Sequence, residues 1–210
     1  MDALRISPKY TSLYWQALDM ADPKDWPKAA DVIRDRLDGR FLRFASNWLS
    51  DRHSGFVVLA IDCLLAETIQ QFVEGIPDDW KGSRKRIKRF LKGPRFQPEF
   101  DADARDAFYT DIRCGLLHQA EAKRMWLIRR QQTALLQKIT GADGQGYIVD
   151  VERFHAGLQG SLNDYLTSIS EPANSVVRAN LWTKMDHICS VRTQRGAVYE
   201  AESDAQITTT

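Results

Sequence analysis

Arg113 and His118 lie five positions apart in the segment 101–121, which predicts a helix. Asp101 or Asp103 can cap its first turn, and apolar residues recur along it at three- and four-residue spacing. At about 100° and 1.5 Å per residue, the arginine and the histidine lie roughly 140° apart around the axis and about 7.5 Å apart along it. A histidine moves protons near neutral pH, and an arginine can neutralise the charge of a phosphorane. The pair therefore fits cleavage of RNA, which supplies its own 2′-hydroxyl nucleophile.

The residues of this helix divide into two faces around its axis. One face is largely apolar and is predicted to be buried; its members are Phe108, Tyr109, Ile112, Gly115, Leu116 and Ala120. The opposite face is polar and gathers Thr110, Asp111, Arg113, Cys114 and His118. Asp111 and Cys114 are therefore candidates for supporting roles, although a nucleophilic cysteine is disfavoured because side chains on one helix face point outward in parallel. An ordinary solvated helix face is the alternative interpretation.

The segment 54–74 is the most apolar part of the chain and predicts a long core helix. Two carboxylates, Asp62 and Glu67, lie within it. Because an isolated buried charge is costly, each must be hydrogen-bonded, paired or protonated. One of them could reach Arg113 and orient its guanidinium; the alternative is a structural pair without a link to the site.

A run of cations without an acidic residue directly precedes the helix that carries Arg113. In a chain of net charge +1, such a run predicts a local positive surface that can bind RNA phosphates. The alternative is a solvated basic helix whose Ile87, Phe90 and Leu91 pack inward. The cations are Lys81, Arg84, Lys85, Arg86, Lys88, Arg89, Lys92 and Arg95.

Composition and cysteine usage bound the class of protein. The 210 residues, 43% hydrophobic and 27% charged, are ordinary for one globular domain with additions. No secretory-type leader and no uninterrupted apolar run of membrane-spanning length is evident, so we expect a cytoplasmic protein without a membrane partner. The cysteines and histidines lack the CxxC and HExxH spacings of metal sites, so we expect neither a metal ion nor another cofactor.

The chain as a whole predicts a mainly α-helical protein with a small β insertion at about 125–150. The glycine-rich segment 141–146 and the β-branched residues after it predict a hairpin or a three-stranded sheet, in which 136–139 pairs with 147–149. Asp150 would then cap the next helix. The predicted divisions are an N-terminal extension packed on the bundle at 1–28, a helical domain at 29–195 and a flexible tail at 196–210.

Arginine followed after four intervening residues by histidine, on a helix of an all-helical domain, resembles the motif of the HEPN superfamily, many of whose members are metal-independent ribonucleases. The surrounding residues FYTDIRCGLLHQAE are similar to bacterial and mobile-element members of the group. The resemblance implies an HEPN-like helical bundle with the β insertion as an addition. It also implies that Arg113 holds the scissile phosphate, that His118 acts as general base or acid, and that two copies of the motif line one cleft in a homodimer.

The same resemblance implies which partners the protein has, and the chain differs from the family's pattern at one position. RNA such as tRNA or mRNA would be the substrate, and an antitoxin or a defence-system protein would be a partner in a toxin or phage-defence setting. Leu117, an apolar residue on the polar face, would serve a dimer contact. The residue after the arginine is usually polar in active HEPN ribonucleases, often Asn, Asp or His, and here it is Cys114. The alternative expectation is therefore a catalytically inactive HEPN-like module that binds RNA or a protein.

Overall fold

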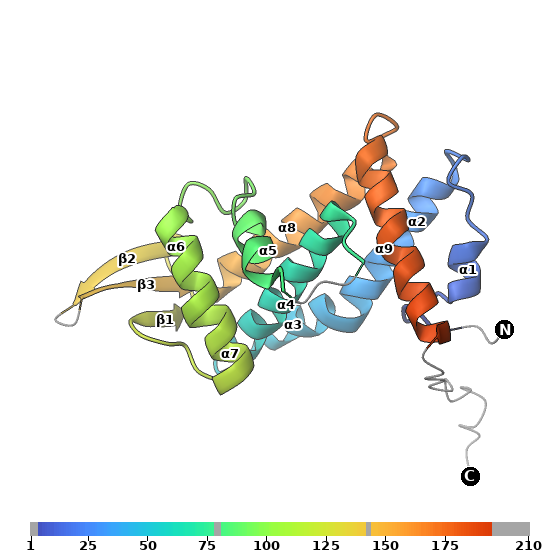
Figure 1. The fold of residues 1–210 in the computed structure, drawn as a ribbon. Helices are drawn as coiled ribbons and strands as arrows, with labels where there is room; N and C mark the ends of the chain where they lie inside the picture. The colour runs from blue at the N-terminus through green and yellow to red at the C-terminus, as the bar shows by residue number, and fades with distance from the viewer. Residues whose placement is uncertain (1–3, 78–80, 142–143, 195–210) are drawn as a thin grey trace, which may run out of the picture.

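The computed structural model describes residues 4–77, 81–141 and 144–194 and is mainly helical, with a small sheet at one end (Figure 1). The central element is α4 (Gly55–Glu74), which ends at Gly75 in the left-handed conformation with φ 64°. It packs against α5 (Ser83–Phe90), α8 (Val151–Ser170) and α9 (Ser175–Gln194). The mainly helical architecture predicted from the sequence is thus confirmed, whereas the predicted tail at 196–210 lies outside the described residues.

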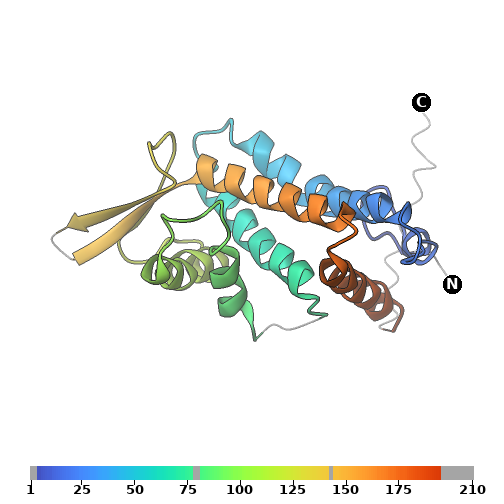
Figure 2. The same ribbon diagram turned by 90° about the horizontal axis from the view of Figure 1, so that it is seen from above.

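The N-terminal part of the chain forms a second layer beside α4 and α8. It comprises α1 (Ser12–Gln16), α2 (Asp25–Leu37), a π-helical turn (Asp38–Leu42) and α3 (Arg43–Trp48). In Figure 2, α2 and α8 run beside one another along the length of the molecule. Within the predicted extension, Trp15 is fully buried and its indole N–H donates to Asp186 of α9 at 3.0 Å. The segment before α2 therefore packs on the helical body.

The β insertion is a three-stranded sheet formed by β1 (Trp126–Arg129), β2 (Leu136–Gly141) and β3 (Gly144–Asp150). The strand order is β1-β3-β2; β2 is antiparallel to β3, and β1 is parallel to it. Leu136 lies opposite Val149, as predicted for the hairpin. The Asp150 carboxylate then accepts the backbone N–H of Arg153 at 2.8 Å, which starts α8 as predicted.

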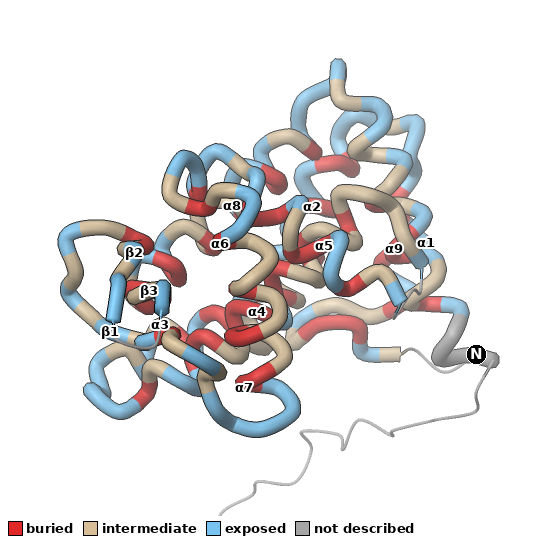
Figure 3. Tube along the Cα trace, turned by 60° about the vertical axis from the view of Figure 1, so that its left-hand side comes forward, coloured by how far each residue is buried: buried red, intermediate tan, exposed pale blue. Residues whose placement is uncertain are grey.

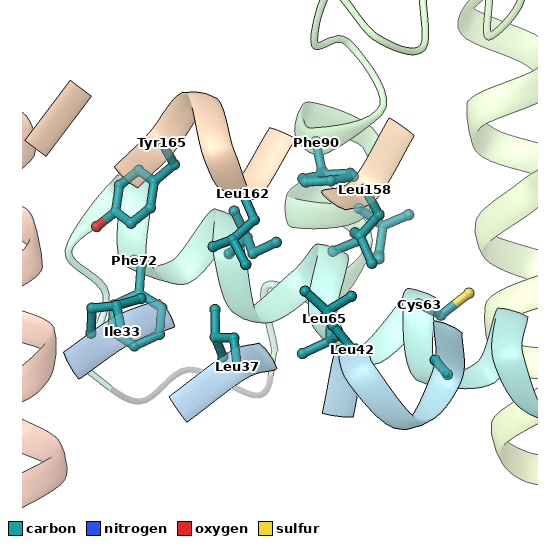
Figure 4. Close-up of a cluster of buried hydrophobic side chains, with 14 of the residues drawn as sticks. Ile33, Leu37, Leu42, Cys63, Leu65, Phe72, Phe90, Leu158, Leu162 and Tyr165 are labelled. Carbon is teal, nitrogen blue, oxygen red and sulfur yellow. The ribbon is translucent and has the colours of Figure 1, made fainter. Parts of the chain in front are cut away.

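The core lies along the inner faces of α2, α4 and α8, where buried residues line the trace in Figure 3. Figure 4 shows these side chains interdigitating, with Leu37 from α2, Leu65 from α4 and Leu158 from α8 among them. A run of aromatic rings continues the core toward the sheet. Phe108 stacks on Phe154 with ring centroids 5.2 Å apart. This packing anchors the helical segment that precedes Arg113 to the rest of the molecule.

By length and composition, α4 is the one helix among the described residues that could cross a membrane, and 44% of its apolar window is buried inside the protein. Its apolar character matches its central position between α5, α8 and α9. Asp62 and Glu67 interrupt its apolar sequence.

Candidate functional site

The segment that carries Arg113 and His118 is one helical run of three parts. These are α6 (Ala102–Ala107), a π-helical segment (Phe108–Arg113) and α7 (Cys114–Gln119). The Asp101 carboxylate caps the run by accepting the backbone N–H of Ala104 at 2.9 Å, as predicted. The π-helical part was not predicted. Its i→i+5 hydrogen bonds place more residues in each turn, so the residues after Phe108 shift around the axis relative to a regular α-helix.

This shift corrects the predicted position of Asp111. The side chain is buried rather than displayed beside Arg113 and His118. It faces the returning chain, where Arg124 Nε lies 3.5 Å from Asp111 Oδ1. Burial raises the pKa of Asp111, and the charges of Arg124 and Lys123 and a hydrogen bond from Trp126 oppose that effect. Asp111 is therefore a structural residue of the π-helical segment and not a supporting residue of the polar face.

Arg113 is held by Glu67 of α4, one of the two carboxylates proposed for that role. Arg113 Nη2 lies 2.9 Å from Glu67 Oε2. The other carboxylate oxygen, Oε1, accepts from Arg86 Nη2 at 3.1 Å, and the Ser83 hydroxyl donates to Oε2 at 2.7 Å. The Arg113 side chain remains 18% exposed. One carboxylate thus fixes a guanidinium that still reaches the surface.

The charge state of Arg113 is secured by the same contact. Partial burial lowers the pKa of this arginine, but the negative charge and the hydrogen bond of Glu67 outweigh it, so that the pKa is raised overall. Cys63 lies on the buried side of this cluster, where burial raises the pKa of its thiol well above the ordinary value. The cluster therefore offers a permanent cation and no nucleophilic Cys63 thiolate.

Asp62 does not reach Arg113, contrary to the second option considered for that residue. Its Oδ1 lies 2.8 Å from His155 Nδ1, with both side chains buried. His155 Nε2 lies 2.9 Å from the Ser46 hydroxyl oxygen, which also accepts from Gln159 at 2.9 Å. The Ser46 hydroxyl oxygen also lies 2.8 Å from the Leu42 carbonyl oxygen. The group resembles a catalytic triad in composition; its aspartate and histidine are buried, and its contacts join α3, α4 and α8.

His118 lies in the last turn of α7 and is exposed. In the described portion of the chain it makes no hydrogen bond or ion pair. Cys114, one turn earlier, is half-buried, and Leu117 is 39% exposed. After α7 the chain turns at Ala120, with φ 53°, and passes so close to Gly115 that a Cβ there would lie 2.3 Å from the Glu121 carbonyl oxygen. A glycine at this position permits the turn that leaves His118 at the surface.

No model of a protein family, no curated protein and no solved structure matches the chain.

The basic run does not form one uniform surface. Arg86 is 1% exposed and pairs with Glu67, so it supports Arg113 from inside and is not a phosphate-binding residue. Arg89 pairs with Glu74 of α4, and Arg95 pairs through two hydrogen bonds with Asp164 of α8. Lys81, Lys85 and Lys92 are exposed. The eight cations expected to form one RNA-binding surface therefore do not share a common surface.

Two further residues of the site were not identified from the sequence. Asp106 of α6 accepts hydrogen bonds from Arg84 and Lys88 of α5. Tyr109 lies close to two cations: the guanidinium carbons of Arg84 and Arg113 are each 5.8 Å from its ring centroid. No sequence spacing signals these contacts, since they join α5 to the helical run that follows a long loop.

The arrangement can do chemistry on an anion without a metal. Among the described residues no group of three or more metal-ligating side chains is assembled. Arg113 is a fixed, partly exposed cation, and His118 is an exposed acid–base group about one and a half turns farther along the helix. A phosphodiester held at Arg113 would meet positive charge, and proton transfer would require a histidine facing the same space.

Proposed function

We propose that the protein is a metal-independent endoribonuclease of the HEPN type that acts as a homodimer. The observation that carries the proposal is the anchoring of Arg113 by Glu67, whose other carboxylate oxygen is held by the buried Arg86. A guanidinium that binds a phosphorane must be positioned before the reaction, because reorganisation during the step would cost rate. A structural arginine would need no exposed fraction, whereas this one keeps 18% of its side chain at the surface.

In the proposed reaction, His118 accepts the proton of the 2′-hydroxyl while O2′ attacks the neighbouring phosphorus. Arg113 binds the non-bridging oxygens, whose negative charge grows in the phosphorane. The bond from phosphorus to O5′ then breaks, and the leaving oxygen takes a proton from a second His118. The products are a 2′,3′-cyclic phosphate and a free 5′-hydroxyl, so neither a metal ion nor a cofactor is needed.

The second histidine comes from a second copy of the chain. Within one helical run, Arg113 and His118 diverge by roughly 140° around the axis, which leaves one copy with an open site. Exposed apolar side chains lie on α7 and on α4, which contacts it: Leu117 of α7 is 39% exposed, and Phe56 and Leu64 of α4 are each 41% exposed. Exposed apolar residues of this size favour a protein interface.

The test is cleavage of total RNA by purified protein in EDTA. Wild type should yield fragments with 2′,3′-cyclic phosphate ends, and His118→Ala and Arg113→Ala should lose cleavage by at least about a hundredfold, the scale of one acid–base group. His53→Ala is the matched control, because His53 is also exposed but lies before α4. Equal cleavage by wild type and His118→Ala, or none by either, would refute the proposal. Sedimentation of the same samples checks the dimer.

An inactive HEPN-like module that binds RNA or a protein partner is the second candidate. Cys114 favours it, because active members of the superfamily usually carry a polar residue, often Asn, Asp or His, after the arginine. Salt-dependent RNA binding without cleavage products would support this candidate over the first. A toxin or phage-defence role, a cytoplasmic setting and an antitoxin-like partner belong to the proposal as well. Growth arrest on expression that depends on His118 would support that role.

A further inference from the structure

We infer that Arg84, Tyr109 and Arg113 form a binding track for one RNA strand, in which Arg84 binds the phosphate next to the one held by Arg113. This inference rests on the proposed function, since it assumes that the ligand of Arg113 is RNA. It replaces the broad basic surface expected from the sequence with a short, defined path across α5 and the π-helical segment.

The geometry of the track comes from Tyr109. The guanidinium carbons of Arg84 and Arg113 each lie 5.8 Å from its ring centroid, so their separation cannot exceed twice that distance. Neighbouring phosphates of a single strand lie within this reach. Each arginine is anchored by a carboxylate, Arg84 by Asp106 and Arg113 by Glu67. Two anchored cations thus lie close to one aromatic ring.

Arg84 and Arg113 can still bind phosphate although each is paired with a carboxylate, because each carboxylate is shared with a second cation. Asp106 is shared by Arg84 and Lys88, and Glu67 is shared by Arg86 and Arg113. Asp106 therefore faces two cations and can neutralise only one of them. The side chains of Arg84 and Asp106 are 54% and 39% exposed. An ion pair this exposed contributes little stability, so a phosphate can compete for Arg84 while Lys88 retains Asp106.

A polar cleft of about 430 Å³ extends the track beyond Arg84. Its lining includes Thr110 and Arg124, and the Arg124 side chain is 75% exposed. Asp103 and Asp106 also line the cleft, and their negative charges repel phosphates that lie close together there. The cleft therefore suits the continuation of one strand rather than the two phosphate backbones of a duplex.

Salt-dependent binding tests the track separately from catalysis. A short single-stranded RNA is titrated by fluorescence anisotropy in the His118→Ala background at several salt concentrations. Arg84→Gln should reduce the slope of log affinity against log salt by about 0.7, the value for one phosphate contact on a single strand. Arg95→Gln is the matched control. Arg95 is also an exposed arginine with two hydrogen bonds to one aspartate, but that aspartate, Asp164, belongs to α8. Its slope should not change.

The outcomes separate the two proposals. An unchanged slope in Arg84→Gln, or an equal loss in Arg95→Gln as a diffuse basic surface would give, overturns the track. Cleavage that depends on His118 together with an unchanged Arg84→Gln slope leaves the ribonuclease proposal standing and removes the track alone. If wild type does not cleave RNA, but Arg84→Gln reduces the salt slope and Arg95→Gln does not, the ribonuclease proposal falls and the track stands. Failure to bind RNA at all overturns the track.

Discussion

The guanidinium of Arg113 lies 2.9 Å from the carboxylate of Glu67, a residue 46 positions earlier in the chain. This contact joins the central helix α4 to the π-helical segment and fixes the cation of the proposed site. Because Arg86 is buried against the same carboxylate, the support of Arg113 is also part of the core. The proposed site and the core therefore share the Glu67 side chain, which makes Glu67 an informative residue to alter.

Glu67→Gln should lower the free energy of unfolding by about 3 kcal/mol or more. The substitution keeps the shape of the side chain but removes the negative charge that Arg86 and Arg113 share, and losing one partner of a buried pair costs about 3–5 kcal/mol. Urea unfolding at neutral pH measures the difference. Asp164→Asn is the control: it removes the exposed partner of Arg95 and should cost at most about 1 kcal/mol. Equal effects of the two substitutions would contradict the assignment.

Asp62→Asn should gain stability relative to wild type as the pH rises. Burial raises the pKa of Asp62, and the hydrogen bond and charge of His155 oppose this effect only in part. A carboxyl group whose pKa is higher in the folded state stabilises the fold below its unfolded pKa of about 3.9, and this contribution is lost as the pH rises through the folded pKa. Asparagine has no such dependence. Unfolding of both proteins at about pH 4 and 7 measures the change, and a constant difference would count against it.

Asp101 should show the opposite pH dependence. The backbone N–H of Ala104, followed by Lys138, lowers the pKa of this carboxylate, so its contribution is present above the unfolded pKa and is lost as the pH falls through the folded pKa. Asp101→Ala should cost about 1 kcal/mol at neutral pH because it removes the helix cap, and Asp101→Asn should cost less because asparagine also caps. The cost of the alanine variant should shrink in acid. An equal cost for both variants at neutral pH would exclude a capping role.

Thiol labelling should distinguish Cys114 from the other two cysteines. Cys63 and Cys189 are buried, and burial raises the pKa of the Cys63 thiol, so both should react only after unfolding. Cys114 is partly exposed beside Arg113 and should react in the native protein. Mass spectrometry after a short exposure to iodoacetamide counts the labelled thiols, with Cys114→Ser as the control. Native labelling of the serine variant would show that the core around α4 opens.

Periodicity and capping chemistry were enough to predict most elements. The apolar segment 54–74, the glycine-rich turn of the sheet and the Asp150 cap all depend on neighbours close in sequence, and each lies where it was predicted. Asp111 was misplaced because a π-helical segment interrupts an apparently regular helix. Its extra residue per turn leaves no clear trace in an apolar pattern of three- and four-residue spacing.

By itself, the sequence determined which chemical groups are present and which helices carry them: a cation and a histidine on one helical run, and a basic segment before it. Only the tertiary structure decided which charges meet. Glu67 rather than Asp62 pairs with Arg113, Arg86 lies inside, and Arg84 faces Tyr109. The physical reason is how far apart in the sequence the interacting residues lie. Helix formation and capping depend on residues within a turn or two, whereas charge pairing depends on how α4, α5 and the π-helical segment pack.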